Sequence, residues 1–323
     1  MLVSWDVLAV AVVVLVVACV LALTAVVLIK AARHAGERRR AVHDEAIRTR
    51  IMMLAVAEDE ALAKLESELA STTGALGEHV ENTLLRMIPE VRGDVRGAMI
   101  RVLAARGLLS RSLDRIHSRG AIQRAAAAEL LGILGGREVI GPLTAALQDK
   151  SLEVRLVAAR ALGVAARPEA GGHLVDALSL TSGIPHSVAA TALLNLPEQD
   201  PAVYIEGLRD RDAGIRYGSA AVVGLLLMSE AADALFDCMV AERGREGASD
   251  VVIAACARSL GRLGHKPAIS ELADISCSSA ASSSVRQAAG EALKAMPGAE
   301  ARDVRRRVIE HADADVRRIL VDA

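Results

Sequence analysis

The stretch that decides the fold is Val154-Arg155-Leu156-Val157-Ala158-Ala159-Arg160-Ala161-Leu162-Gly163. With Val154 as position 0, the residues at positions 0, 4 and 8 share one face of a helix, because side chains four residues apart are neighbours on a helical surface. The small residue between the larger ones lets a second helix approach closely. We expect the glycine at position 9 to end the helix in a left-handed conformation.

The same pattern recurs at a nearly regular interval along the chain, with the two outer apolar slots eight residues apart in every copy. The copies run from Val95 to Leu103, Gln123 to Leu131, Val154 to Leu162, Val188 to Leu196, Ile215 to Val223, Val252 to Leu260 and Val285 to Leu293, with a shortened copy from Val316. In the fourth copy Ala189 replaces the arginine and Pro197 stands in place of the glycine. We therefore expect this copy to bend the array.

A second amphipathic stretch precedes each copy, for example residues 139–147, so each unit is predicted to be an antiparallel helix pair. Helices of about 12 residues gain most of their stability from tertiary packing, and stacking the pairs supplies it. The predicted fold is therefore all-α, an α-solenoid of about eight helix pairs over residues 78–323.

The pattern resembles HEAT repeats, in the short subclass named after phycobilisome lyases. The resemblance implies that the Val-Arg helices line the concave surface and carry a ladder of arginines there. These arginines are Arg96, Arg124, Arg155, Arg216, Arg286 and Arg317. A structural role is the competing interpretation, in which they bind backbone carbonyls and turn carboxylates such as Asp94, Asp149, Asp212 and Asp315.

Position 6 of the repeat supplies the candidate contact residues for a protein partner. They are Arg101, Glu129, Arg160, Arg258 and Glu291. Their mixed signs predict a polar groove that binds a protein rather than a uniform anion.

The N-terminal part of the chain predicts a membrane anchor. Residues 7–29 carry no charge, and at about 1.5 Å per residue they are long enough for a bilayer core of about 30 Å. A cleaved signal peptide is the alternative, but it needs a basic start and a shorter apolar run. Residues 30–50 hold seven basic and three acidic residues, which places the C-terminal side in the cytoplasm.

Four segments follow from these observations. They are a short extracytoplasmic N-terminus (1–6), a transmembrane helix (7–29), a basic juxtamembrane segment with an amphipathic helix (30–77) and the solenoid (78–323).

Catalytic signals are weak, so we expect no enzyme, no cofactor and no metal site. The cysteines Cys19, Cys238, Cys256 and Cys277 form no CxxC pair and are expected to be free, buried thiols. The eight histidines lack metal-binding spacing. The D-x-D at Asp313 and Asp315 is assigned to helix capping.

The sequence favours a single-pass plasma-membrane protein whose cytoplasmic solenoid is a scaffold for protein partners, themselves at the membrane. A narrower version makes it an accessory subunit of a membrane complex such as a polysaccharide-synthesising glycosyltransferase or a transporter. The rival class, a HEAT-like nucleic-acid-binding protein or enzyme, needs a basic groove lined by aromatic residues. The chain has only four aromatic residues and a formal net charge of −2, so we expect no nucleic-acid partner.

Overall fold

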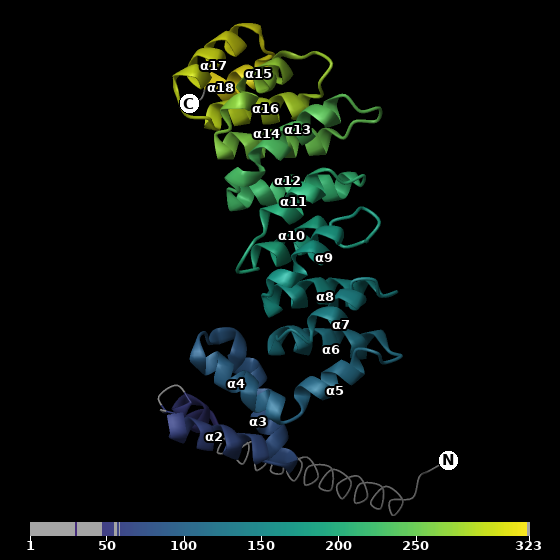
Figure 1. The fold of residues 1–323 in the computed structure, drawn as a ribbon, viewed down its shortest axis with the longest axis vertical. Coiled ribbons are helices and arrows are strands. Elements are labelled where there is room, and N and C mark those ends of the chain that lie inside the picture. Colours follow the sequence, from purple (N-terminus) through teal and green to yellow (C-terminus); the bar gives the residue numbers. More distant parts are fainter. Residues whose placement is uncertain (1–29, 31–46, 55–56, 58, 322–323) are drawn as a thin grey trace, which may run out of the picture. The chain divides into compact units, whose positions relative to one another are not determined.

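The computed structural model describes residues 30, 47–54, 57 and 59–321. All regular secondary structure in these ranges is helical (Figure 1). The chain divides into two compact units, residues 1–108 and 109–323. The predicted anchor, residues 7–29, lies outside the described residues, as does most of the basic segment after it. None of the helices in the described part of the chain has the length and hydropathy needed to cross a bilayer.

Unit 1 holds α2 (Asp59–Ser71), α3 (Gly74–Met87), a 3-10 turn η1 (Ile88–Glu90) and α4 (Asp94–Ala105). Helix α2 packs against α3 and α4. The division between the units falls after α4, inside the range that the sequence assigns to the solenoid. Arg106 closes the C-terminal end of α2, since its Nη1 donates to the carbonyl oxygens of Leu69 and Thr72 at 3.0 and 2.6 Å.

Unit 2 consists of helix pairs stacked in sequence order (Figure 1). Helices of the odd-numbered row are α5 (Leu108–Arg115), α7 (Ile140–Ala146), α9 (Gly171–Asp176), α11 (Pro201–Leu208), α13 (Ala232–Arg243), α15 (Ile269–Cys277) and α17 (Ala299–His311). Helices of the even-numbered row are α6 (Ala121–Leu134), α8 (Leu152–Ala165), α10 (His186–Leu194), α12 (Ala213–Leu226), α14 (Asp250–Leu263), α16 (Ser283–Ala295) and α18 (Ala314–Val321). Short 3-10 turns η2 (Pro168–Ala170), η3 (Ser229–Ala231) and η4 (Lys266–Ala268) lead into α9, α13 and α15.

The two rows pack differently along the stack. Most neighbours in the even-numbered row, such as α6 and α8, lie much closer together than neighbours in the odd-numbered row. A stack that is tighter on one side curves toward that side. We therefore call the even-numbered helices, which carry the Val-Arg pattern, the inner row.

Position 8 of the repeat forms the centre of the core. Leu131, Leu162, Val223, Leu260 and Leu293 occupy it in successive inner helices, and all are fully buried. Because this face of each inner helix points to the odd-numbered row, positions 6 and 10 lie on the opposite, exposed face.

The glycine at position 9 does not end the helix, contrary to the expectation from sequence. Helix α8 continues past Gly163 to Ala165, and the left-handed residue is Ala166 at position 12, with φ 52°. Leu227 and Gly264 take the same position and conformation after α12 and α14.

The glycine at position 9 instead allows two inner helices to touch. A Cβ on Gly132, Gly163, Gly224 or Gly261 would lie 2.5–2.9 Å from the Cα of a small residue on the next inner helix. Those residues are Ala161, Ala192, Ser259 and Ala292. Three of the four stand at position 7 of their repeat, which makes a glycine against a small residue the standard inner-row junction.

The same junction corrects the alignment of the fourth repeat by three residues. Ala192 meets Gly163 as a position 7 residue should, so position 0 is Pro185 rather than Val188. Leu193 then falls at position 8 and is fully buried, as in the other repeats. With this alignment the intervals before and after the fourth repeat become nearly equal, which they are not when the repeat starts at Val188.

Candidate protein interface

Arginines at position 1 join the turn before their own helix to the next turn of the array. Arg124 donates from Nε and Nη2 to the carboxylate of Asp149 at 2.7 and 2.8 Å. Its Nη1 donates to the carbonyl oxygens of Ser118 and Arg119 at 3.0 and 2.9 Å. One planar guanidinium therefore satisfies the turn before α6 and binds a carboxylate in the turn after α7.

The joint made by Arg216 is the most buried of this kind. Its Nε and Nη2 each donate to the carboxylate of Glu242 at 3.0 Å, and the two side chains are 5% and 1% exposed. The Ser249 backbone N–H also donates to Glu242, at 2.9 Å. Arg286 repeats the joint with Asp313 at 2.7 Å.

The remaining arginines of the predicted ladder differ from these three. Arg155 donates to the carbonyl oxygen of Asp149 at 2.8 Å and Arg317 to that of Ala312 at 3.0 Å. Arg96 is half-buried on α4, in unit 1. The carboxylates that receive Arg124, Arg216 and Arg286 are thus those of Asp149, Glu242 and Asp313, and only the first of them was named as an arginine partner from the sequence.

These contacts shift the acidity of two carboxyl groups. The hydrogen bond from Arg124 holds the pKa of Asp149 below its ordinary value, although partial burial opposes this. The backbone N–H of Val316, followed by Arg286, lowers the pKa of Asp313 in the same direction. Both residues are therefore ionised at neutral pH and support the turns they bridge.

The series of joints is interrupted at the fourth repeat. Arg155 has no carboxylate to bind, because the position that corresponds to Asp149 in the next turn is Leu180. The Nε of Arg155 is buried without a hydrogen-bond partner among the described residues. His186 occupies the arginine position of this repeat and packs edge-on against Tyr217.

The five candidate contact residues at position 6 are all exposed. Arg101 lies in unit 1 and pairs with Glu66 on α2 at 2.6 Å. Glu129, on α6, and Arg160, on α8, have no ion-pair partner among the described residues of the chain. Arg258 and Glu291, on α14 and α16, pair with each other at 2.8 Å. The structure thus places the last four along one face of unit 2.

The centre of this face carries no charged residue and was not recognised from the sequence. Position 6 is Thr191 on α10 and Ala221 on α12. The sequence pattern did not indicate Thr191 because the fourth repeat starts three residues earlier than expected, and it did not indicate Ala221 because an alanine carries no signal for binding. Val164, Leu194 and Leu225 lie beside them and are 47%, 38% and 52% exposed. We call these five residues the central uncharged surface.

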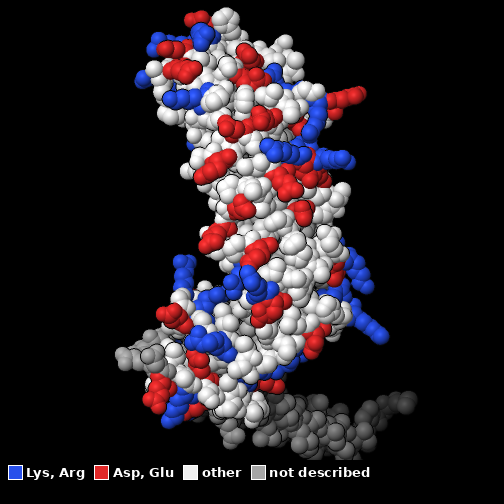
Figure 2. Space-filling view, viewed as in Figure 1, with Lys and Arg blue, Asp and Glu red and all other residues white. Residues whose placement is uncertain are grey.

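The odd-numbered row of the middle repeats is acidic. Residues 168–242 include eleven Asp or Glu and three Arg, and red side chains predominate over the middle of unit 2 in Figure 2. Such a surface repels nucleic acid, whose affinity comes from neutralising phosphates.

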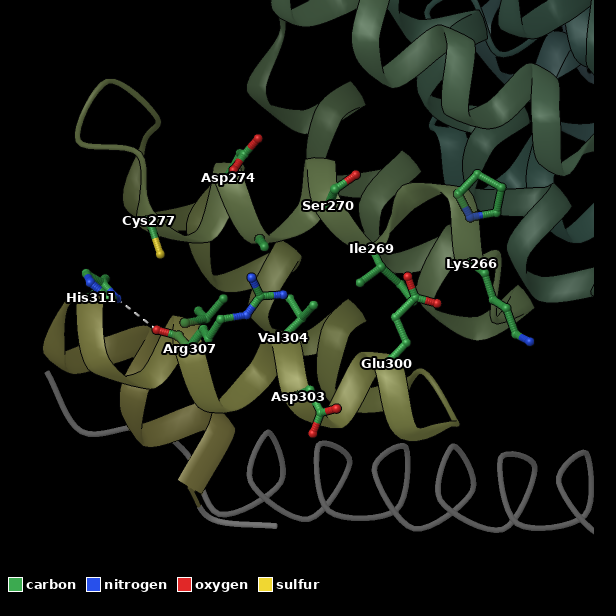
Figure 3. A pocket seen from close by; sticks show the side chains of 13 residues that line it. Lys266, Ile269, Ser270, Asp274, Cys277, Glu300, Asp303, Val304, Arg307 and His311 are labelled. Atoms are coloured by element: carbon green, nitrogen blue, oxygen red, sulfur yellow. Dashed lines mark hydrogen bonds between the residues drawn. The ribbon is translucent and has the colours of Figure 1, made fainter.

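A groove of about 960 Å³ lies between α15 and α17 (Figure 3). Its floor is apolar and its rim carries charged side chains, among them Asp274 and Arg307. Cys277 lies at one end and is exposed, unlike the buried Cys238 and Cys256, so the expectation that all the thiols are buried is wrong for this residue. In the described part of the chain, no group of three or more His, Cys, Asp or Glu could hold a metal ion.

Comparisons with known proteins agree with the repeat architecture. Residues 123–149, from α6 to the turn after α7, match the family described as PBS lyase HEAT-like repeat. The chain therefore contains a HEAT-like repeat and forms an all-α solenoid in unit 2.

Two solved structures are similar to the chain. The X-ray structure of the Escherichia coli protein YibA is 17% identical, with a TM-score of 0.42, over 82% of this chain and 97% of that one. Human deoxyhypusine hydroxylase in complex with glycerol is 19% identical, with a TM-score of 0.32, over 81% and 94%. No curated protein matches the sequence.

Proposed function

We propose that this protein is a scaffold that binds a protein partner through the exposed face of its inner row and is anchored by residues 7–29 at the cytoplasmic side of the plasma membrane. The observation that carries the proposal is the face formed by positions 6 and 10 of α6 to α16, at which all residues are exposed except the half-buried Ile133 and Ala221. Stacked repeats present such a face over many helices, and binding is the use that a long surface with few reactive groups favours.

The composition of this face supports a protein as the partner. It holds opposite charges at its ends and apolar side chains at its centre. Contact surfaces between proteins combine an apolar centre with a polar rim. A uniform anion would instead require a continuous basic surface.

Anchoring rests on the N-terminal sequence. Twenty-three uncharged residues are followed at once by Lys30 and a basic segment, the pattern of a single span with its C-terminal side in the cytoplasm. A tethered scaffold meets membrane partners at a raised effective concentration. This favours the role of an accessory subunit of a membrane complex, such as a polysaccharide-synthesising glycosyltransferase or a transporter.

Photo-crosslinking in intact cells tests the proposal. A photoreactive residue at Ala126 or Gln287, on the inner row, is expected to give discrete adducts that mass spectrometry identifies as a membrane protein. The same residue at Asp237, exposed on α13, is the matched control. Equal crosslinking from both rows would refute the binding face, and a protease-sensitive C-terminal body in intact spheroplasts would refute the orientation.

A further inference from the structure

Between α6 and α16, one inner-row junction is built differently from the others. At α10 and α12 the glycine of position 9 is replaced by Leu194, and position 7 of the next helix is Val222 instead of a small residue. Two larger side chains hold these helices apart. Helices α10 and α12 pack less closely than any other consecutive pair of the inner row. Leu194 remains 38% exposed at this junction instead of being covered by α12.

The central uncharged surface around this junction offers few hydrogen-bonding groups. The Thr191 hydroxyl already donates to the carbonyl oxygen of Ser187 at 2.7 Å, and the other four members are Val, Leu, Ala and Leu. An extended peptide laid on this surface would leave backbone N–H and C=O groups without partners, whereas a helix satisfies its own. The surface therefore fits a helix with an apolar stripe.

Positive charges border this surface on both sides. Arg160 lies on α8, and Arg258 and Arg262 lie on α14; all three are exposed. Arg160 and Arg262 have no ion-pair partner among the described residues, and the exposed pair of Arg258 with Glu291 is of the kind that contributes little. Charge complementarity thus requires acidic residues at both ends of the partner's apolar stripe.

A second copy of the chain does not meet this requirement. In a two-fold pairing of inner faces through the central uncharged surface, Arg160 of one copy would face Arg258 of the other, and like charges at an interface are unfavourable. The occupant is a different protein.

We propose that the central uncharged surface, bordered by Arg160 on one side and Arg258 and Arg262 on the other, is the docking site for an amphipathic helix with an apolar stripe and acidic residues near both ends. The inference rests on the scaffold function proposed above and names its partner's chemistry. Three steps between inner helices at 8–10 Å each separate the two borders by about 25–30 Å. A helix that spans this distance at about 1.5 Å per residue has roughly 20 residues.

Synthetic peptides provide the test, with fluorescence anisotropy on the full-length protein in detergent. The probes are three helices of the length just given, built on one shared frame. The first has a leucine stripe with glutamates at both ends, the second the same stripe with lysines at both ends, and the third the glutamate ends with serines in the stripe. We expect the first to bind at least about ten times more tightly than either of the others.

Variants of exposed residues give the second readout. The double variant Arg160→Glu/Arg258→Glu is expected to reverse the preference toward the lysine peptide, and Leu225→Asp to weaken the glutamate peptide at least about tenfold. Asp237→Lys, on α13, is the matched control and is expected to change nothing. Circular dichroism confirms that each variant is folded, which these exposed positions favour.

The outcomes separate the two proposals. Equal binding of the glutamate and lysine peptides, or unchanged binding by Leu225→Asp, overturns the docking site. If crosslinks still form at Ala126 or Gln287 in cells, the scaffold function survives that result. Absence of any inner-row crosslink overturns both.

Discussion

Substituting two glycines by alanine is expected to change stability in opposite directions. Gly163 lies at an inner-row junction, where a Cβ would lie 2.7 Å from the Cα of Ala192 and 2.9 Å from its Cβ. Gly172, on α9, has nothing within 4 Å of that point and is not followed by a proline. Both backbones are helical, so alanine is conformationally favourable at each, by about 0.5–1 kcal/mol.

The close contact decides the sign at Gly163. Ordinary van der Waals contact begins near 3.4 Å, so α8 and α10 must separate by several tenths of an ångström, and their backbones cannot rotate out of the way. Overpacking of this kind costs about 1–3 kcal/mol. Subtracting the helical preference leaves Gly163→Ala destabilised by about 0.5–2 kcal/mol, whereas Gly172→Ala is stabilised by about 0.5–1 kcal/mol.

Urea unfolding followed by circular dichroism in the far ultraviolet measures both variants against the unmodified protein. Amide hydrogen exchange shows where the loss occurs, and Gly163→Ala should accelerate exchange in α8 and α10 first. If the two variants shift stability in the same direction, or if the loss appears in α7 instead, the close junction between α8 and α10 is wrong.

Three further expectations concern the turns and caps. Glu242→Ala is expected to cost about 3–5 kcal/mol because it leaves Arg216 as a buried, unpaired charge, while Arg216→Met/Glu242→Leu is expected to be nearly neutral. Urea unfolding of both variants compares their stability, and equal losses would argue against the buried pair. Leu227→Gly is expected to stabilise by about 1 kcal/mol, since Leu227 has φ 54°, and a loss measured by thermal unfolding would contradict the left-handed cap. The lowered pKa of Asp149 means that its charge supports the fold above its unfolded-state pKa, about 3.9, and that this support disappears as pH falls through the folded value. Asp149→Asn should therefore flatten the acid limb of the urea midpoint plotted against pH, and an unchanged limb would show that the Arg124 contact does not set it.

The helix pairs and the exposed side of the inner row could be predicted from sequence. Residues at positions 0, 4 and 8 must share a face, and position 6 then lies opposite, which is why Glu129, Arg160, Arg258 and Glu291 were found and are all exposed. Periodicity is sufficient for this step because it depends only on helical geometry.

The role of the glycine at position 9 could not be read in the same way. A glycine such as Gly163 near a helix end fits both a left-handed cap and a close contact with a neighbour. Only the position of the next helix distinguishes them, and in the structure the cap falls three residues later, at Ala166. The arginine partners are ambiguous for a related reason, since turns offer several carboxylates, as Asp313 and Asp315 show.

The fourth repeat was misaligned because two frames satisfy the same apolar pattern. Val188 with Leu196 and Pro185 with Leu193 are each eight residues apart, and alanine stands midway in both. The contact of Ala192 with Gly163 selects the second frame, and this is information about a neighbouring helix that a single repeat does not contain.

With position 0 at Pro185, three residues at the fourth repeat differ from the usual pattern, and all three affect how α10 stacks on its neighbours. Leu180 removes the carboxylate for Arg155, His186 removes the arginine, and Leu194 removes the glycine that would let α12 close on α10. The first two changes each remove a joint between turns, and Leu180 and Leu194 leave apolar surface uncovered. Ser179, whose hydroxyl donates to the cap carboxylate of α12, restores only one link across the turn. A repeat selected for stacking alone would keep these three residues in their usual form. Their loss together, beside exposed leucines on the inner face, supports the docking site proposed above.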